Sequence, residues 1–262
     1  MLEVINPSIV GAFVALGLFL GIIACLQLGR RIGARAIRRR RASSLPSTES
    51  LETAVFALLG LLIAFTFSGA LTRFDLRRSQ AVDEVNAIGT AYLRVDLLPE
   101  PAQPGVRELL RQYVDARIDT YGKLPDLEGA RDALARSQSL QADLWRQAIA
   151  AAQSPASGLE TRTVFLPALN QMFDLATTRV AATQMHPPVV VYAMLVALAL
   201  AAALLAGYRS ADGAQSSLHQ IGFGAIVALT VYVILDMEYP RLGFIRIDAI
   251  DQLLIHARAA MG

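Results

Sequence analysis

The sequence predicts an all-α integral membrane protein with four transmembrane helices, arranged as two pairs on either side of an extramembrane helical bundle. Three observations lead to this fold class. The 262-residue chain is 54% hydrophobic and 18% charged. Its long apolar segments form two pairs, one near each end of the sequence. The polar stretch between the pairs has the apolar spacing of helices and no strand-like alternation of useful length.

The apolar segments predict spans at about residues 9–29, 53–72, 187–208 and 219–239. About 20 apolar residues suffice for a helix to cross the hydrocarbon core of a bilayer, and the first three segments carry no ionisable side chain. The fourth is charge-free from Ile221 to Leu235, and flanking residues extend it to the interfaces. The expected organisation is a transmembrane hairpin (1–72), a polar block (73–186), a second hairpin (187–240) and an amphipathic segment (241–262).

An arginine cluster after the first span predicts the membrane orientation. We expect its members in a short loop: Arg30, Arg31, Arg35, Arg38, Arg39, Arg40 and Arg41. Positive charge in short loops marks the cytoplasmic side, so the polar block is expected outside the cytoplasm. Arg73, Arg77 and Arg78 follow the second span and favour the opposite orientation. A patch for anionic lipids is an alternative interpretation of the cluster.

The polar block is expected to form an antiparallel helical bundle. An apolar seam with alternating spacings of four and three, as in a coiled coil, follows the second span: Ala81, Val85, Ile88, Tyr92 and Val95. The span and this seam therefore predict one helix of about 45 residues, near 68 Å long, which Pro101 and Pro104 end. Further helices are expected at about 104–123, 127–152 and 160–185, and the segment 241–262 is expected to dock on the bundle.

The sequence contains none of the usual catalytic or metal-binding motifs, so we expect no enzymatic activity, no metal and no other cofactor. Its one cysteine, Cys25, lies in the first span and excludes a disulfide within the chain. The net charge of +2 gives no reason to expect nucleic acid as a partner. The first three spans carry no Asp, Glu, Lys, Arg or His, and Asp236 and Glu238 fall at the outer end of the fourth, which argues against a coupled pump or transporter.

Two sets of residues are candidates for function. Side chains along the second span predict a pore lining, and packing against other helices or lipid is the other interpretation: Ile63, Thr66, Phe67, Thr72 and Phe74. Polar residues on the two helices that lead out of and into the spans predict a buried ionic network that fixes helix register. A ligand or ion site is the alternative for this second set: Glu84, Asn86, Arg94, Asn170, Asp174 and Arg179.

Three stretches resemble a bacterial membrane family known as bestrophin-like. They are LLIAFTFSGALTRFDLRRSQAVDEVNAIGTAYLRVDLLP at Leu61–Pro99, LPALNQMFDLATTRVAATQMHPP at Leu166–Pro188 and DMEYPRLGFIRI at Asp236–Ile247. The resemblance implies a multi-pass protein of the bacterial inner (plasma) membrane. The layout is also similar to that of bestrophins proper, which are pentameric anion channels with a pore-lining second span. That similarity implies an apolar neck at Ile63, Phe67 and Phe74, although the arginine cluster predicts the opposite orientation in the membrane.

We therefore expect a homo-oligomeric ion channel, with anions as candidate permeant ions and the second span lining the pore. The expected partners are the lipid bilayer, further copies of the chain and an inorganic ion. The alternative is a non-conducting membrane sensor or scaffold, whose extracytoplasmic helical bundle binds a partner protein. Assembly and conductance discriminate between the two, because a pore built from four-span subunits needs a ring.

Overall fold

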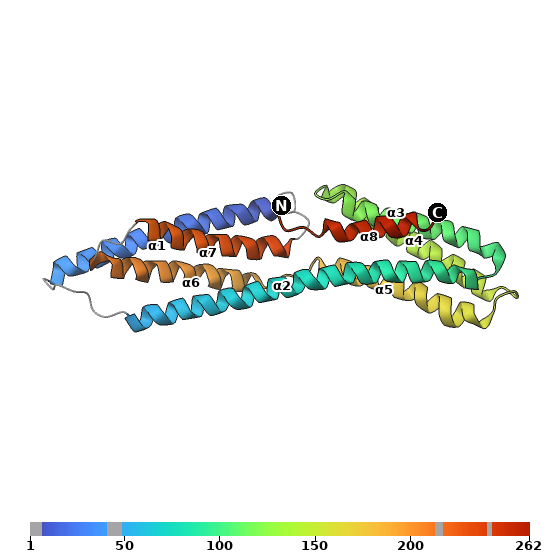
Figure 1. Ribbon diagram of the computed structural model, residues 1–262, viewed down its shortest axis with the longest axis horizontal. Coiled ribbons are helices and arrows are strands. Elements are labelled where there is room, and N and C mark those ends of the chain that lie inside the picture. Colours follow the sequence, from blue (N-terminus) through green and yellow to red (C-terminus); the bar gives the residue numbers. More distant parts are fainter. Residues whose placement is uncertain (1–6, 41–48, 213–216, 240–242) are drawn as a thin grey trace. The chain divides into compact units, whose positions relative to one another are not determined.

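A computed structural model describes residues 7–40, 49–212, 217–239 and 243–262 of the chain (Figure 1). These residues form helices and connecting segments, with no strand among them. They belong to two compact units. The first draws on Met1–Arg73 and His186–Tyr239 and is called the apolar unit below. The second draws on Phe74–Met185 and Pro240–Gly262 and is called the bundle unit.

The apolar unit contains α1 (Pro7–Arg40), the first part of α2 (Glu49–Leu93), α6 (Val189–Arg209) and α7 (Ser217–Glu238). A short 3-10 helix, η4 (Ser210–Asp212), follows α6. Among the described residues, these four long helices are the ones apolar enough to cross a membrane. The predicted all-helical fold with four candidate membrane-spanning helices is therefore confirmed.

The core of the apolar unit is filled by aliphatic side chains. α1 packs against both α6 and α7, and the three helices run alongside one another in Figure 1. Ile22 of α1 and Ala199 of α6 are completely buried in this core, and Leu59 of α2 reaches it. Such side chains from several helices pack together into one apolar cluster.

Two glycines allow α1 and α6 to approach closely. A methyl group on Gly29 of α1 would collide with the carbonyl oxygen of Leu204, and one on Gly207 of α6 would collide with that of Leu26. Small residues permit such close backbone packing between membrane helices. Gly17, in contrast, faces open space, where an added methyl group would meet no other atom.

The arginine cluster lies on α1 and not in the loop where the sequence analysis expected it. The helix continues through Arg40, because arginine and alanine dominate this stretch and both favour helix. Arg30, Arg31, Arg35, Arg38 and Arg39 are exposed along the end of this helix. Arg41 lies outside the described residues.

The second part of α2 enters the bundle unit. α2 is one helix of 45 residues, which confirms the prediction that the second apolar segment and the following seam are continuous. It ends at Leu93, and two 3-10 helices follow, η1 (Arg94–Leu97) and η2 (Glu100–Ala102). The remaining helices are α3 (Gln103–Gly122), α4 (Leu127–Gln153), the π-helical turn η3 (Thr161–Phe165), α5 (Leu166–Ala182) and α8 (Asp248–Ala259).

The predicted seam of α2 lies in the bundle core. Ile88 and Val95 are fully buried, together with Tyr113 of α3 and Leu144 of α4. α8 packs on the same core through Leu254, as the sequence predicts for the amphipathic segment. The chain end is also fixed, because the carbonyl oxygen of Met261 accepts hydrogen bonds from Tyr92 at 2.6 Å and from Arg111 at 2.9 Å.

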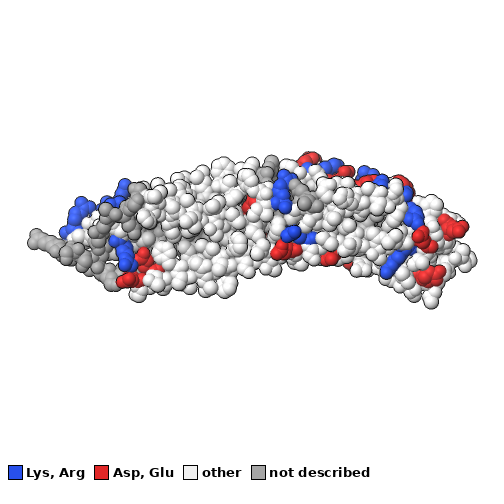
Figure 2. Space-filling view, in the orientation of Figure 1, with Lys and Arg blue, Asp and Glu red and all other residues white. Residues whose placement is uncertain are grey.

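Charge is distributed differently on the two units. On the face drawn in Figure 2, the long apolar helices show almost no charged surface between their ends. Charged side chains gather at one end of these helices and over the helices of the bundle. This pattern is typical of helices that cross a bilayer and meet water only at their ends.

Candidate functional site

α2 is the least covered of the four apolar helices. Of the most apolar 18 residues of α2, 11% are buried within the chain, whereas the same share is 22% for α1 and for α6 and 28% for α7. Contacts from the apolar core reach α2 on one side, where Phe56 stacks edge-to-face on Phe223 of α7 at 5.6 Å. No described part of the chain covers the opposite side of α2, which is available to lipid or to another copy.

The predicted pore residues lie on different sides of α2. Phe67 is 39% exposed and Thr72 is exposed as well. Because they stand five residues apart on one helix, they lie about 140° apart around its axis, with Thr72 on the uncovered side and Phe67 at its margin. Ile63 packs against the apolar core. Thr66 is half-buried, and its hydroxyl donates to the carbonyl oxygen of Leu62 at 2.8 Å.

Phe74, the last predicted pore residue, belongs to the bundle unit and is half-buried. The guanidinium carbon of Arg78 lies 5.8 Å from the centre of its ring. Phe74 stands seven residues after Phe67 on the same helix, so these two rings lie on nearly the same side of α2.

A buried carboxylate holds the end of the apolar unit together. Glu238 of α7 is 2% exposed and accepts a hydrogen bond from Nε of Arg73 at 2.9 Å. Nδ1 of His186 lies 3.4 Å from the other carboxylate oxygen, and the His186 ring stacks on Tyr239 at 4.7 Å. Arg73 of α2, the segment before α6 and the end of α7 thus share one polar cluster next to the charge-free stretches.

Arg77, one turn further along α2, has a different partner. Its guanidinium is buried and donates to the carbonyl oxygens of Ala182 at 3.2 Å and Met185 at 3.1 Å. Ala182 is the last residue of α5, where a helix leaves carbonyl acceptors without intrahelical partners, and Met185 follows three residues later. Arg77 therefore joins α2 to the end of α5.

The bundle unit contains a buried ionic network centred on Glu84 of α2. Glu84 accepts hydrogen bonds from Nε of Arg117 and from Nη1 of Arg179, both at 2.6 Å. Arg179 also donates to Asp251 of α8 at 2.6 Å, and its guanidinium carbon lies 3.8 Å from the centre of the Tyr121 ring. The network links α2, α3, α5 and α8, and its two carboxylates balance its two guanidinium groups.

The network perturbs the pKa values of its members. Burial alone would raise the pKa of Glu84, but Arg117 and Arg179 outweigh it and hold that pKa below its ordinary value. Burial lowers the pKa of both arginines, whereas Tyr121 and Glu84 raise it by more. Glu84, Arg117 and Arg179 therefore stay ionised near neutral pH, which suits a structural network more than proton transfer.

The other predicted members lie outside this network. Asn170 and Asp174 are exposed on α5 and bond to each other at 3.0 Å. Asn86 is exposed on α2. Arg94 donates to the carbonyl oxygen of Val164 at 3.2 Å. Of the six predicted residues, the structure brings together Glu84 and Arg179.

Sequence reasoning missed Arg117, Tyr121 and Asp251. A signal for Arg117 was present, because it stands four residues after Tyr113 and four before Tyr121, within the apolar face of its helix. An arginine inside such a face requires a buried partner. Asp251 had no comparable signal, because the docking face of α8 is defined only by the fold.

The described residues offer no obvious place for a metal ion. Among them, no group of three or more His, Cys, Asp or Glu side chains is arranged to hold one. The carboxylates that are deeply buried in the two clusters described above, Glu84 and Glu238, already face guanidinium groups.

Comparison with known proteins gives one match. The chain matches the Bestrophin-like domain over residues 20–250. No curated protein and no solved structure matches the chain. The match covers both pairs of apolar helices and the helices between them. Together with four helices long and apolar enough to span a bilayer, it identifies the chain as a membrane protein of the Bestrophin-like family.

Proposed function

We propose that this protein is a homo-oligomeric ion channel of the bacterial inner membrane, with α2 lining a pore between subunits and anions as candidate permeant ions. The observation that carries the proposal is the uncovered side of α2. Only 11% of the most apolar 18-residue stretch of this helix is buried within the chain. Membership in the Bestrophin-like family supports it. The proposal includes no enzymatic activity.

The apolar core favours a pore between copies over a path within one subunit. Ile22, Ala199 and their neighbours fill the centre of the unit, and an ion there would lose its hydration without gaining polar ligands. A ring of α2 helices would instead turn the uncovered side of each copy, which carries Thr72 and has Phe67 at its margin, toward a common axis. An apolar constriction with nearby hydroxyls is a known design for a gated pore.

The proposed arrangement has two transmembrane hairpins and a bundle outside the cytoplasm. The exposed arginines on α1 support it, because positive charge near short loops marks the cytoplasmic side. Arg73 and Arg77 point to the other orientation, but both have structural roles, with Glu238 and with the end of α5. Reporter fusions at residues 45 and 130 test the orientation, since the proposal expects the first inside and the second outside.

Assembly and conductance test the channel itself. The full chain, purified in detergent, should have the mass of a ring, and in planar bilayers it should give discrete conductance steps. F67A should change the single-channel conductance severalfold. The matched control is F13A, which makes the same change at a side chain that is 68% exposed on α1. A stable monomer without conductance contradicts the proposal, and a non-conducting oligomer favours the sensor or scaffold.

A further inference from the structure

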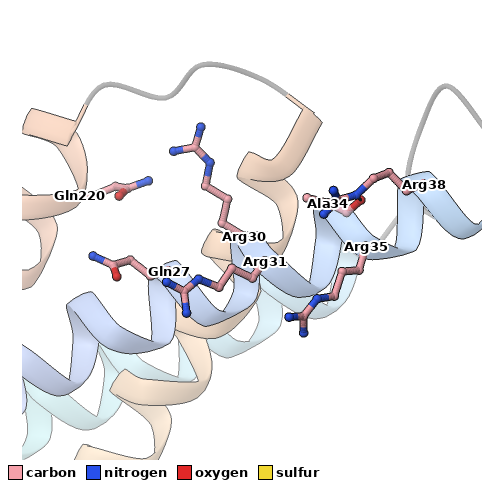
Figure 3. Close-up of a pocket in the computed structure, with 7 residues that line it drawn as sticks. All are labelled: Gln27, Arg30, Arg31, Ala34, Arg35, Arg38 and Gln220. Atoms are coloured by element: carbon pink, nitrogen blue, oxygen red, sulfur yellow. Dashed lines mark hydrogen bonds between the residues drawn. The ribbon is translucent and has the colours of Figure 1, made fainter.

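A basic pocket lies at one end of the apolar unit, between α1 and α7. It has a volume of about 650 Å³ and is lined by α1 between Gln27 and Arg38 and by Gln220 of α7. Figure 3 shows Gln27 and Gln220 at one end of the pocket and the arginines along α1 beyond them. The side chain of Arg38 turns back along the helix, and its Nε donates to the carbonyl oxygen of Ala34 at 3.3 Å.

The positive charge of this pocket has no counterpart among the described side chains. Arg30, Arg31 and Arg35 form no ion pair with a described carboxylate, and no other described polar partner holds them. Arg31 and Arg35 are one helical turn apart, where like charges destabilise a helix. An arrangement of this kind is favourable when an anion lies between the guanidinium groups.

The nearest acidic residues of α2 are already paired. Arg209, at the end of α6, lies 3.2 Å from Glu52 and 3.6 Å from Glu49. α6 packs on α1 at this same end, where a methyl group on Gly33 would lie 2.5 Å from the carbonyl oxygen of Tyr208. Arg209 thus offsets one of these two negative charges, and among the described side chains no ion pair joins Glu49 or Glu52 to the arginines of the α1 pocket.

The position of the pocket suits a phosphate at the membrane surface. α1 carries no ionisable side chain from Ile9 to Gly29, and the arginines begin at the next residue. A helix whose apolar part spans the hydrocarbon core places the residues after it at the level of the phosphate groups. Gln27 and Gln220 add neutral amides that can donate to ester or glycerol oxygens.

We propose that the α1–α7 pocket binds a phosphate group, as carried by an anionic phospholipid, with Arg31 and Arg35 as its main ligands. Guanidinium groups bind phosphate through paired N–H donors, which gives geometry as well as charge. The same chemistry would accept a soluble phosphate, so the test separates the two sources. The proposal does not depend on conduction, because a scaffold would hold the lipid equally well.

Native mass spectrometry of the full chain in detergent tests the proposal with phosphatidylglycerol and phosphatidylcholine of the same chain length. Wild type should retain the anionic lipid at least tenfold better than the zwitterionic one. R31Q/R35Q should lose roughly tenfold to thirtyfold in affinity for phosphatidylglycerol. The control R78Q/R146Q removes the same charge from arginines that are 52% and 76% exposed in the bundle unit, and it should bind as wild type does.

A competition arm identifies the source of the phosphate. If millimolar inorganic phosphate displaces phosphatidylglycerol, the pocket is a soluble-phosphate site; if it does not, the lipid is the ligand. Equal retention of the two lipids by wild type, or equal affinity of R31Q/R35Q and its control, overturns the proposal. Should R31Q/R35Q fail to fold, the wild-type unfolding temperature decides: it should rise with phosphatidylglycerol and not with phosphatidylcholine, and an equal rise with both refutes phosphate binding.

Discussion

Glu84 of α2 and Arg179 of α5 meet through a 2.6 Å hydrogen bond in the centre of the bundle unit, with Glu84 fully buried and Arg179 only 4% exposed. The residues stand 95 positions apart in the sequence. Arg117 approaches the same carboxylate from α3. Two buried guanidinium groups therefore rely on one carboxylate to balance their charge and accept their hydrogen bonds.

Replacing Glu84 with glutamine should strongly destabilise the bundle unit. The substitution keeps the shape of the side chain but leaves Arg117 and Arg179 buried without their shared anion, at a cost of about 3–5 kcal/mol. We expect the thermal unfolding temperature in detergent to fall by roughly 10 °C. D174N is the control, because Asp174 is exposed, and it should change the temperature by little. Similar unfolding temperatures for E84Q and wild type would contradict a structural role of the network.

The stability of the bundle should also depend on pH through Glu84. Arg117 and Arg179 outweigh burial and hold the pKa of Glu84 below its ordinary value of about 4.5 in the folded chain. The contribution of Glu84 to stability is therefore fully present above about pH 4.5 and is lost as the pH falls through the folded pKa. Unfolding temperatures measured between pH 7 and pH 3 should differ by a constant amount between wild type and E84Q above pH 5. The difference should shrink below pH 4.5. A constant difference over the whole range would assign the effect of E84Q to shape and not to charge.

The close approach of α1 and α6 predicts a sharp contrast between glycines. G207A should destabilise the apolar unit by about 1–3 kcal/mol, because the new methyl group would collide with the carbonyl oxygen of Leu26. G17A should be neutral or slightly stabilising, since Gly17 faces open space and alanine favours helix. Unfolding in detergent, followed by helical circular dichroism, measures both. The interpretation fails if G17A proves the more harmful of the two.

Two neighbouring leucines test whether α8 belongs to the bundle core. Leu254 is 1% exposed and Leu253 is 37% exposed. L254A should lower the free energy of unfolding by about 2–4 kcal/mol, whereas L253A should cost under about 1 kcal/mol. Chemical denaturation of the full chain in detergent gives both values. Equal effects would favour a helix that lies on the membrane surface instead.

Apolar patterning was sufficient to predict the helices, because a segment without charge and a seam with helical spacing each define their own element. The same patterning could not show which way a polar pair faces. Asn170 and Asp174 share one side of α5, but the buried side carries Met172, Ala176 and Arg179. Spacing of polar residues places them on a common side, and only the neighbouring apolar residues indicate which side is inside.

The arginine cluster shows a second limit. A charged run after an apolar segment suggests a loop, yet arginine and alanine are good helix formers and α1 continues through the run. Gly29 and Gly33 lie at the edge of that polar run, outside the apolar centre of the span, so the sequence alone gives no sign of their close packing on α6. The more central Gly17 has no atom within 4 Å of an added methyl group.

The bundle unit is built from two stretches of the sequence that are made at different times during translation. Its core needs Leu254 from α8, but two apolar helices, α6 and α7, separate α8 from α5. During translation the ribosome therefore delivers most of the bundle before α6 and α7, and the final helix after them. Until then Arg179 lacks Asp251 and the site of Leu254 stays open. Maturation of the bundle is thus a late step, which waits for the synthesis of two long apolar helices.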